Sequence, residues 1–367
     1  MRLLDTDNPL LSEIQSSIKS ILLTDGQTLD SLAMTNERRH SILKALVTYS
    51  DTIPHPADGM TYKDKGDSRS AVSNTLIRWQ ILAYVASIDL TIAKWFESHL
   101  DALSILHELG HQNNTQGLWA IWAAEGHPDP LRYQDSQVNG TKAWCSGAHT
   151  VDHALVTYRD EEGNSQLLTI DMHQPNIHIH NEAWQAVGMQ DTDTATVRFD
   201  KAVASSAGSA NAYLDRTGFW HGAAGVAACW YGATTRIAAY LVAAYQRKPH
   251  DYKAMYLGQV STALSITRQY FCHVAELIDT QPHSTHELAI RQLRANVEQV
   301  ARRVIEDVGQ ALGAAPFCTN AHFARLTADL PVFIRQSHGA FDLQKIGELS
   351  SDLSANSTDK QENIWQL

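Results

Sequence analysis

Cysteine is scarce in this sequence, with four residues among 367: Cys145, Cys229, Cys272 and Cys318. No two of them stand at the Cys-x-x-Cys spacing that zinc sites and dithiol redox centres use. Widely spaced thiols of this kind are typical of a reducing compartment. We therefore expect four reduced thiols and a cytoplasmic protein.

Long apolar runs and an excess of basic residues are also missing. No run reaches the roughly 20 apolar residues that a membrane-spanning helix requires, and residues 1–5 turn polar too early for the apolar core of a secretory signal. The formal net charge is −11, whereas nucleic acids and anionic membranes call for a basic face. We expect a soluble, unexported protein with neither kind of partner.

The composition itself, 44% hydrophobic and 19% charged, is that of a globular protein long enough for two or three domains. Apolar positions recur at helical spacing in residues 8–50 and 73–110, with a solvated loop expected at 63–67. The period then falls to about two until residue 204, and becomes helical again from 213 to 346. The pattern predicts an α+β, mainly α protein. Its expected parts are a helical N-terminal domain (1–112), a middle β-domain (113–208), a C-terminal four-helix bundle (209–349) and a polar tail (350–367).

The stretch 140–152, Gly-Thr-Lys-Ala-Trp-Cys-Ser-Gly-Ala-His-Thr-Val-Asp, is the most distinctive in the chain. Its turn signals predict a short strand that ends beside Ser146, with Trp144 just before it. An indole that packs on a tricyclic ring and a hydroxyl that bonds the ring edge are what a flavin site needs. A hairpin with a buried tryptophan is the alternative interpretation.

This stretch resembles the Gly-x-Lys-x-Trp-x-Thr/Ser segment of the acyl-CoA dehydrogenase superfamily, in which Trp144 and Ser146 occupy the positions that contact the flavin. Residues 187–190 and 196–203 resemble the end of the same family's β-domain. The resemblance implies an acyl-CoA dehydrogenase-like fold, with a β-barrel middle domain that holds the flavin ring, and FAD between this domain and the bundle. It also implies a homodimer or homotetramer, and an electron-transfer or flavin-reductase partner.

The activity implied by the resemblance is removal of an alpha proton from an acyl thioester and transfer of a beta hydride to FAD. Beside Trp144 and Ser146, the implied cofactor contacts are Trp122 and Cys145 at the ring, and Gln310 and Gly313 in a segment similar to the family's Gln-x-x-Gly-Gly-x-Gly. The chain departs from the family at Ala124, where a hydroxyl is usual, and lacks the Arg-x-x-Phe-Gly segment expected after residues 236–243.

Two residues are candidates for the base. Asp215, before Arg216, matches the Glu-Arg pair that opens the first bundle helix in some family members, and a carboxylate at a helix N-terminus is its alternative role. The other family position is occupied by Ser337 and His338 instead of Glu-Gly. His338 resembles a histidine of flavin-dependent monooxygenases of the same fold, and a neutral imidazole suits proton transfer near neutral pH.

Two histidine-rich patterns suggest metals without completing a site. His107-Glu108-Leu109-Gly110-His111 matches the zinc-hydrolase motif, but Gly110 is expected to end the helix that the motif requires. His178 and His180 would share one strand face, and no third ligand is evident. We predict no metal site.

Small residues crowd one predicted helix, at Gly218, Gly222 and Gly225 with the alanines 223, 224, 227 and 228. Close approach of another helix or of a flat ligand would each explain them. Two other functions also stay open: a monooxygenase of the same fold that a partner supplies with reduced flavin, and a non-catalytic homologue that acts as a binding or assembly module.

Overall fold

The N-terminal third is helical. The computed structural model describes residues 8–22, 34–65, 68–111 and 115–356. Its first helices are α1 (Pro9–Leu22), α2 (Asn36–Val47), α3 (Asn74–Ile88) and α4 (Leu90–Glu108), with a short 3₁₀ turn at Ser50–Thr52. The oxygen of Thr35, Ser73 or Asp89 accepts a hydrogen bond from a backbone N–H at the start of α2, α3 and α4, respectively.

A hairpin of β1 (Met60–Lys65) and β2 (Ser68–Ser73) precedes α3. The solvated loop expected at 63–67 therefore begins within a strand, which corrects that prediction, and residues 66–67 lie outside the described part of the chain. Strand pairing over residues 60–65 overrides the polar composition on which the expectation rested.

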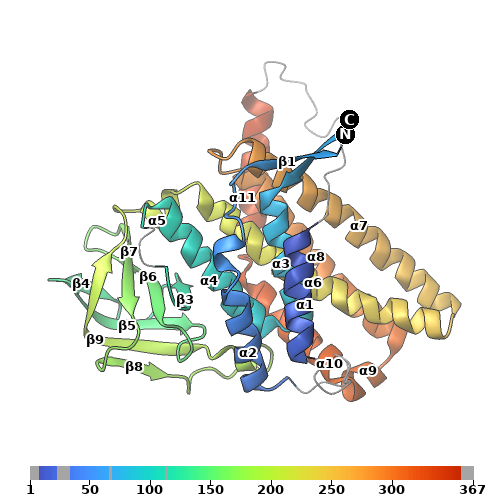
Figure 1. Cartoon of the computed structure of the whole chain (residues 1–367), viewed down its shortest axis with the longest axis horizontal. Helices are drawn as coiled ribbons and strands as arrows, with labels where there is room; N and C mark the ends of the chain where they lie inside the picture. Colours follow the sequence, from blue (N-terminus) through green and yellow to red (C-terminus); the bar gives the residue numbers. More distant parts are fainter. Residues whose placement is uncertain (1–7, 23–33, 66–67, 112–114, 357–367) are drawn as a thin grey trace.

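The middle part is one sheet that covers the flank of α4 (Figure 1). Its strands run in the order β3-β6-β7-β9-β5-β4, with β8 paired to β9, and only β3 and β6 are parallel neighbours. Burial along β9 largely alternates, as expected for a sheet with one face on the core. The strands are β3 (Trp119–Trp122), β4 (Arg132–Gln134), β5 (Gln137–Cys145), β6 (His153–Arg159), β7 (Ser165–Asp171), β8 (Ile177–His180) and β9 (Ala195–Ser206).

Helices of very different length form the last part, from four residues in α5 to 30 in α6 and α7. They are α5 (Ala212–Asp215), α6 (Gly218–Arg247), α7 (Asp251–Thr280), α8 (Glu287–Leu312), α9 (Ala315–Thr319), α10 (Ala321–Phe333) and α11 (Ala340–Asn356), with 3₁₀ turns at Gln190–Thr192 in the middle part and Ile334–Gln336 before α11. In Figure 1, α6 and α7 extend away from the sheet as an antiparallel pair. Helix α11 continues past Ser350 to Asn356, so the first residues of the segment expected as a polar tail are helical.

The small residues of α6 are explained by helix packing. A Cβ added to Gly232 would lie 2.0 Å from the carbonyl oxygen of Ala83 on α3, and one on Gly222 would lie 2.5 Å from a carboxylate oxygen of Asp101 on α4. Gly232 lies beyond the run at 218–228, in which Gly218 and Gly222 meet carboxylate side chains of α4 rather than helix backbone. The neighbours that the described residues place against this run are therefore protein side chains.

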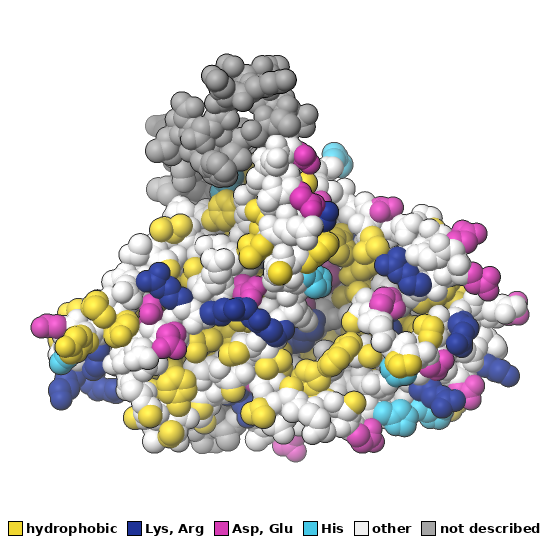
Figure 2. Space-filling view, turned by 180° about the vertical axis from the view of Figure 1, so that it is seen from behind, with side chains coloured by type: hydrophobic (Ala, Val, Ile, Leu, Met, Phe, Trp, Pro, Cys, Tyr) yellow, Lys and Arg dark blue, Asp and Glu magenta, His cyan; other side chains and the backbone are white. Residues whose placement is uncertain are grey.

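The surface has no strong segregation of charge on the face shown in Figure 2. Lys and Arg side chains lie scattered among acidic and apolar ones over this view. No helix in the described ranges is both long and apolar enough to cross a bilayer.

Gly232→Ala tests the packing of α3 on α6. We expect a loss of about 1–3 kcal/mol in the free energy of unfolding, because the new methyl group meets backbone that cannot rotate away. Gly258→Ala, on α7 with open space around its Cα, is the matched control and should gain about 0.5–1 kcal/mol from helix propensity. Urea unfolding measures the free energy of unfolding of both variants. An equal increase in Gly232→Ala and Gly258→Ala would contradict the packing argument.

Candidate functional site

Trp144 stands on the surface at the end of β5 in an unusual conformation. Its φ of 62° is left-handed, and the pairing of β5 with β9 shifts register between Lys142 and Cys145. The indole is 61% exposed and contacts the ring of Trp184 edge-on, with centroids 6.0 Å apart. A bulky residue at positive φ is strained by about 1–3 kcal/mol. This bulge holds a broad apolar surface open to solvent.

Ser146 follows two residues later and is half-buried. Its Oγ lies 3.0 Å from Thr194 Oγ1, and its carbonyl accepts a hydrogen bond from Trp122 Nε1 at 3.1 Å. Trp122 is 3% exposed and Cys145 is fully buried, where burial raises the pKa of the thiol. Of the four residues predicted to contact a flavin ring, Trp144 and Ser146 therefore reach the surface, while Trp122 and Cys145 support them from beneath.

The loop from Met189 to Thr194 holds this turn in place. Thr192 O accepts hydrogen bonds from Trp95 Nε1 at 2.8 Å and Gly147 N at 2.9 Å. Asp193 accepts from both the backbone N–H and the Nδ1 of His149, each at 2.7 Å. Sequence patterns missed this loop because its partners lie more than 40 residues away along the chain.

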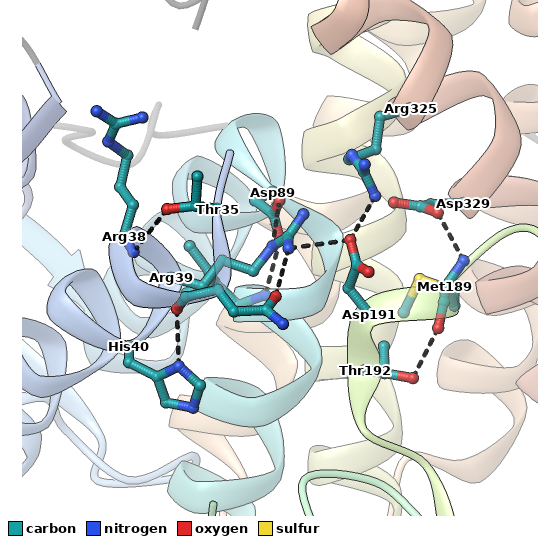
Figure 3. A network of polar contacts seen from close by, with 12 residues as sticks. Thr35, Arg38, Arg39, His40, Asp89, Met189, Asp191, Thr192, Arg325 and Asp329 are labelled. Carbon is teal, nitrogen blue, oxygen red and sulfur yellow. Dashed lines mark hydrogen bonds and ion pairs between the residues drawn. The ribbon is translucent and has the colours of Figure 1, made fainter. Parts of the chain in front are cut away.

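Ion pairs fasten the same loop to the helical parts on both sides (Figure 3). Asp191 lies between Arg39 of α2, at 2.9 Å, and Arg325 of α10, at 2.7 Å. Arg39 also pairs with Asp89 at 3.0 Å, where α3 meets α4. Elements from all three parts of the chain thus meet at one loop.

Asp329 of α10 completes this junction. Its Oδ1 accepts a hydrogen bond from Met189 N at 2.6 Å, while its Oδ2 is buried without a partner among the described residues. Burial raises the pKa of Asp329 to about 6; the charge of Asp89 acts in the same direction, against the Met189 N–H and the two arginines. This carboxyl is therefore a group that titrates near neutral pH.

Lys142, the lysine of the Gly-x-Lys-x-Trp motif, has a structural role. It is 2% exposed, and its Nζ donates to Glu125 Oε1 at 2.9 Å and to Thr157 Oγ1 at 3.0 Å. Burial lowers its pKa. The lysine ties β5 to β6 beneath the site.

Asp215, the first candidate base, is exposed at the end of the short helix α5, which packs against β7 and α6. The carboxylate that caps α6 is instead Glu108 of α4, whose Oε1 accepts from Gly218 N at 3.0 Å and whose Oε2 pairs with Arg216 at 3.1 Å. Helix α4 ends at Glu108, as the position of Gly110 predicts. In the described ranges no three His, Cys, Asp or Glu side chains are arranged to bind a metal ion.

His338, the second candidate base, is exposed between α10 and α11. Its backbone N–H donates to Asp342 at 3.1 Å, Asp342 pairs with Arg291 of α8, and the Arg291 guanidinium lies 4.2 Å from the ring centre of Trp220. The segment that carries His338 is therefore fastened to α8 and to the start of α6. Asp342, four residues after His338, was not anticipated from sequence.

Gln310 and Gly313, the predicted nucleotide contacts, lie together at the end of α8. They line a hollow of about 530 Å³ with Glu306 and Phe317. Gln310 Nε2 donates to Glu306 Oε1 at 2.8 Å, and Gly313 ends the helix with φ 70°. In Figure 1 this end of the molecule, at α9, is remote from the sheet.

Comparison with known proteins supports the acyl-CoA dehydrogenase fold. Residues 130–202 match the family model described as acyl-CoA dehydrogenase, middle domain. The chain is similar to butyryl-CoA dehydrogenase from Megasphaera elsdenii, at 14% identity over 96% of this chain and 100% of that one, with a TM-score of 0.76. No curated protein matches the sequence.

Two further similar structures contain FMN. One is FMN-bound TdsC from Paenibacillus sp. A11-2, at 14% identity over 94% of this chain and 97% of that one, with a TM-score of 0.72. The other is KijD3 with FMN and a dTDP-linked amino sugar, at 15% identity over 96% and 95%, with a TM-score of 0.71. The predicted fold class is confirmed.

Asp329→Asn tests the buried carboxyl. The folded chain holds a proton on Asp329 between about pH 4 and 6 that the unfolded chain has released, so this group's stabilising contribution is complete below about pH 4 and is lost as the pH rises through about 6. Relative to Asp329→Asn, the wild-type protein should lose roughly 2–3 kcal/mol of unfolding free energy over this window.

Urea unfolding at a series of pH values measures this difference. Asp200→Asn, which changes an exposed carboxylate of β9, is the control and should leave the wild-type slope unchanged. If the unfolding free energies of wild type and Asp329→Asn changed in parallel with pH, Asp329 would not titrate in this range.

Proposed function

We propose that this chain, a divergent member of the acyl-CoA dehydrogenase superfamily, is a flavin-dependent oxidoreductase whose flavin ring lies against Trp144 and Ser146. The observation that carries the proposal is the exposed indole of Trp144, held at positive φ beside a half-buried hydroxyl. A flat aromatic ligand would cover the indole, and Ser146 would bond its polar edge. When bound, flavin supplies the hydride and oxygen chemistry that the side chains of this protein lack.

Of the two reactions considered, the site favours the oxygen-dependent one. Dehydrogenation requires a carboxylate that faces the ring. Asp215 and His338 are both exposed, so exposure does not separate them; the difference is that Ser337 and His338 stand where the family has a second carboxylate. We propose His338 as the group that moves a proton, and a flavin-reductase partner as the source of reduced flavin. FMN-containing TdsC, described as a dibenzothiophene monooxygenase, is consistent with this choice.

Acyl thioester dehydrogenation with FAD is the second candidate. Asp215 keeps its place before Arg216, and the hollow at Gln310 and Gly313 suits the pyrophosphate of a dinucleotide. The missing Arg-x-x-Phe-Gly segment removes the usual adenine contact of FAD. The choice between FMN and FAD therefore requires titration of the protein with each flavin.

A homodimer or homotetramer, in the cytoplasm, belongs to the same proposal. Large apolar side chains are exposed on two helices: on α7, Tyr252 (68%), Met255 (48%) and Ile266 (64%), and on α11, Phe341 (50%) and Leu343 (51%). Association between copies of the chain would bury them.

Trp144→Ala tests the ring site. The protein as purified, and after titration with FMN and FAD, should show a bound-flavin absorption spectrum, and the variant should bind about tenfold more weakly because the indole contact is lost. Val203→Ala removes an equally exposed apolar side chain (60%) from the same sheet and should bind like wild type. Failure of the wild-type protein to bind micromolar FMN or FAD would refute the proposed function and favour a binding or assembly module.

The two reactions are separated by adding butyryl-CoA to the flavin-loaded protein without oxygen. We expect no bleaching of the flavin absorbance. When reduced flavin and oxygen are supplied instead, we expect oxygen consumption with formation of a hydroxylated product. His338→Ala should slow the oxygen-dependent reaction by about 10²–10⁴-fold, whereas Asp215→Ala should not. Bleaching by butyryl-CoA that Asp215→Ala abolishes would establish the dehydrogenase instead.

A further inference from the structure

A chain of three hydroxyl groups runs from the interior to Ser146. Thr192 Oγ1 donates to the carbonyl oxygen of Met189 at 2.8 Å, and lies 2.8 Å from Thr194 Oγ1. Thr194 Oγ1 in turn lies 3.0 Å from Ser146 Oγ. Thr192 is 1% exposed and Thr194 5%, whereas Ser146 is half-buried. The chain therefore opens toward a ligand at one end only.

On distance alone either hydroxyl of each pair could donate, but counting hydrogens selects one direction when all three bonds form at once. Each hydroxyl carries one hydrogen, so three hydrogens serve three hydrogen bonds. The Met189 carbonyl can only accept, which sends the Thr192 hydrogen to it. Thr194 must then donate to Thr192, and Ser146 must donate to Thr194. Ser146, whose hydrogen then goes to Thr194, can only accept from a further partner.

The interior end of this chain is well anchored. The Met189 carbonyl also accepts from Trp184 Nε1 at 3.2 Å and from Thr192 N at 3.3 Å. The N–H of Met189 is held by Asp329. A carbonyl fixed in this way does not turn away from Thr192, and the order of donors persists as long as the loop keeps its place.

We propose that Thr192 and Thr194 are positioning residues that make Ser146 a hydrogen-bond acceptor, so that the ring site prefers reduced flavin, whose N5 carries a hydrogen, to oxidised flavin, whose N5 does not. This inference rests on the proposed function. If Ser146 donated to an oxidised ring, two hydrogens would remain for three protein bonds, and one buried hydrogen bond would be lost. If Ser146 instead accepts a hydrogen bond from the N5–H of reduced flavin, all three protein hydrogen bonds remain.

Valine substitutions that keep shape and remove the hydroxyl test the direction. In Thr194→Val, Ser146 loses its acceptor and becomes free to donate. In Thr192→Val, the Thr194 hydrogen can turn to Ser146, with the same result. The ratio of the Kd for oxidised flavin to that for reduced flavin should fall by about tenfold in each variant. The midpoint potential of bound flavin should fall by about 30 mV, the equivalent for a two-electron couple.

The measurement is anaerobic titration of each protein with oxidised and with dithionite-reduced FMN and FAD, with the potential of the bound flavin as a second readout. Thr234→Val is the matched control: Thr234 is 1% exposed, and its Oγ1 donates to Trp230 O within α6. Thr194→Ser restores a hydroxyl and should restore the wild-type ratio and potential.

An unchanged ratio in both valine variants, with flavin still bound, would overturn the relay, as would an equal shift in Thr234→Val. If the Kd ratio fell in Thr194→Val and stayed low in Thr194→Ser, the change would be due to altered packing at position 194 rather than to the lost hydroxyl. That result would also overturn the relay. If wild-type protein bound neither redox form, the proposed function itself would fail, and this inference with it.

Discussion

The peptide that joins Gly188 to Met189 is the point on which the arrangement around Trp144 depends. A Cβ at Gly188 would lie 2.0 Å from the carbonyl oxygen of Ala328, so the loop approaches α10 as closely as backbone allows. Asp329 holds the N–H of this peptide, and the Arg39–Asp191–Arg325 bridge holds the next turn. Asp191 is 26% exposed and Arg325 38%, so solvent screens this bridge. The Arg39–Asp89 pair behind it is buried, and removing one of its partners would cost about 3–5 kcal/mol because it leaves a charge uncompensated. The surface around Trp144 is therefore built by contacts with helices from both ends of the chain as much as by the β-sheet that carries it.

Periodicity was sufficient to predict the order of helical and β-rich parts, because apolar spacing reports directly on which faces are buried. Periodicity failed to predict the hairpin before α3, where hydrogen bonding between two polar strands decides the structure. It also failed to predict that α11 extends to Asn356. The strand end at Trp144 and Ser146 could be predicted because its spacing and turn chemistry are local. Exposure could not be predicted in the same way: Trp144 is 61% exposed, whereas Trp122 and Cys145 are buried by packing from distant parts of the chain.

Long-range polar contacts account for what sequence reasoning missed. Asp329 meets Met189 across 140 positions, and Arg39 meets Asp89 across 50. The spacing of neighbouring residues in the sequence does not indicate such pairs, because each residue taken alone resembles an ordinary surface charge. The same limit applies to Glu108, which belongs to an apparent zinc motif but caps α6 from another helix. Asp215 was placed by motif as a candidate base, and the helix-end role considered as its alternative is performed at α6 by Glu108.

The backbone of Trp144 bears on the stability of the free protein. Glycine or asparagine would occupy the same left-handed position with less strain, so either replacement would raise stability if nothing bound there. A large aromatic side chain here therefore costs the folded chain about 1–3 kcal/mol, which a ligand that covers the indole would offset. Trp144→Gly would separate the two effects, since it raises the stability of the free protein while it removes the surface on which a ligand would pack.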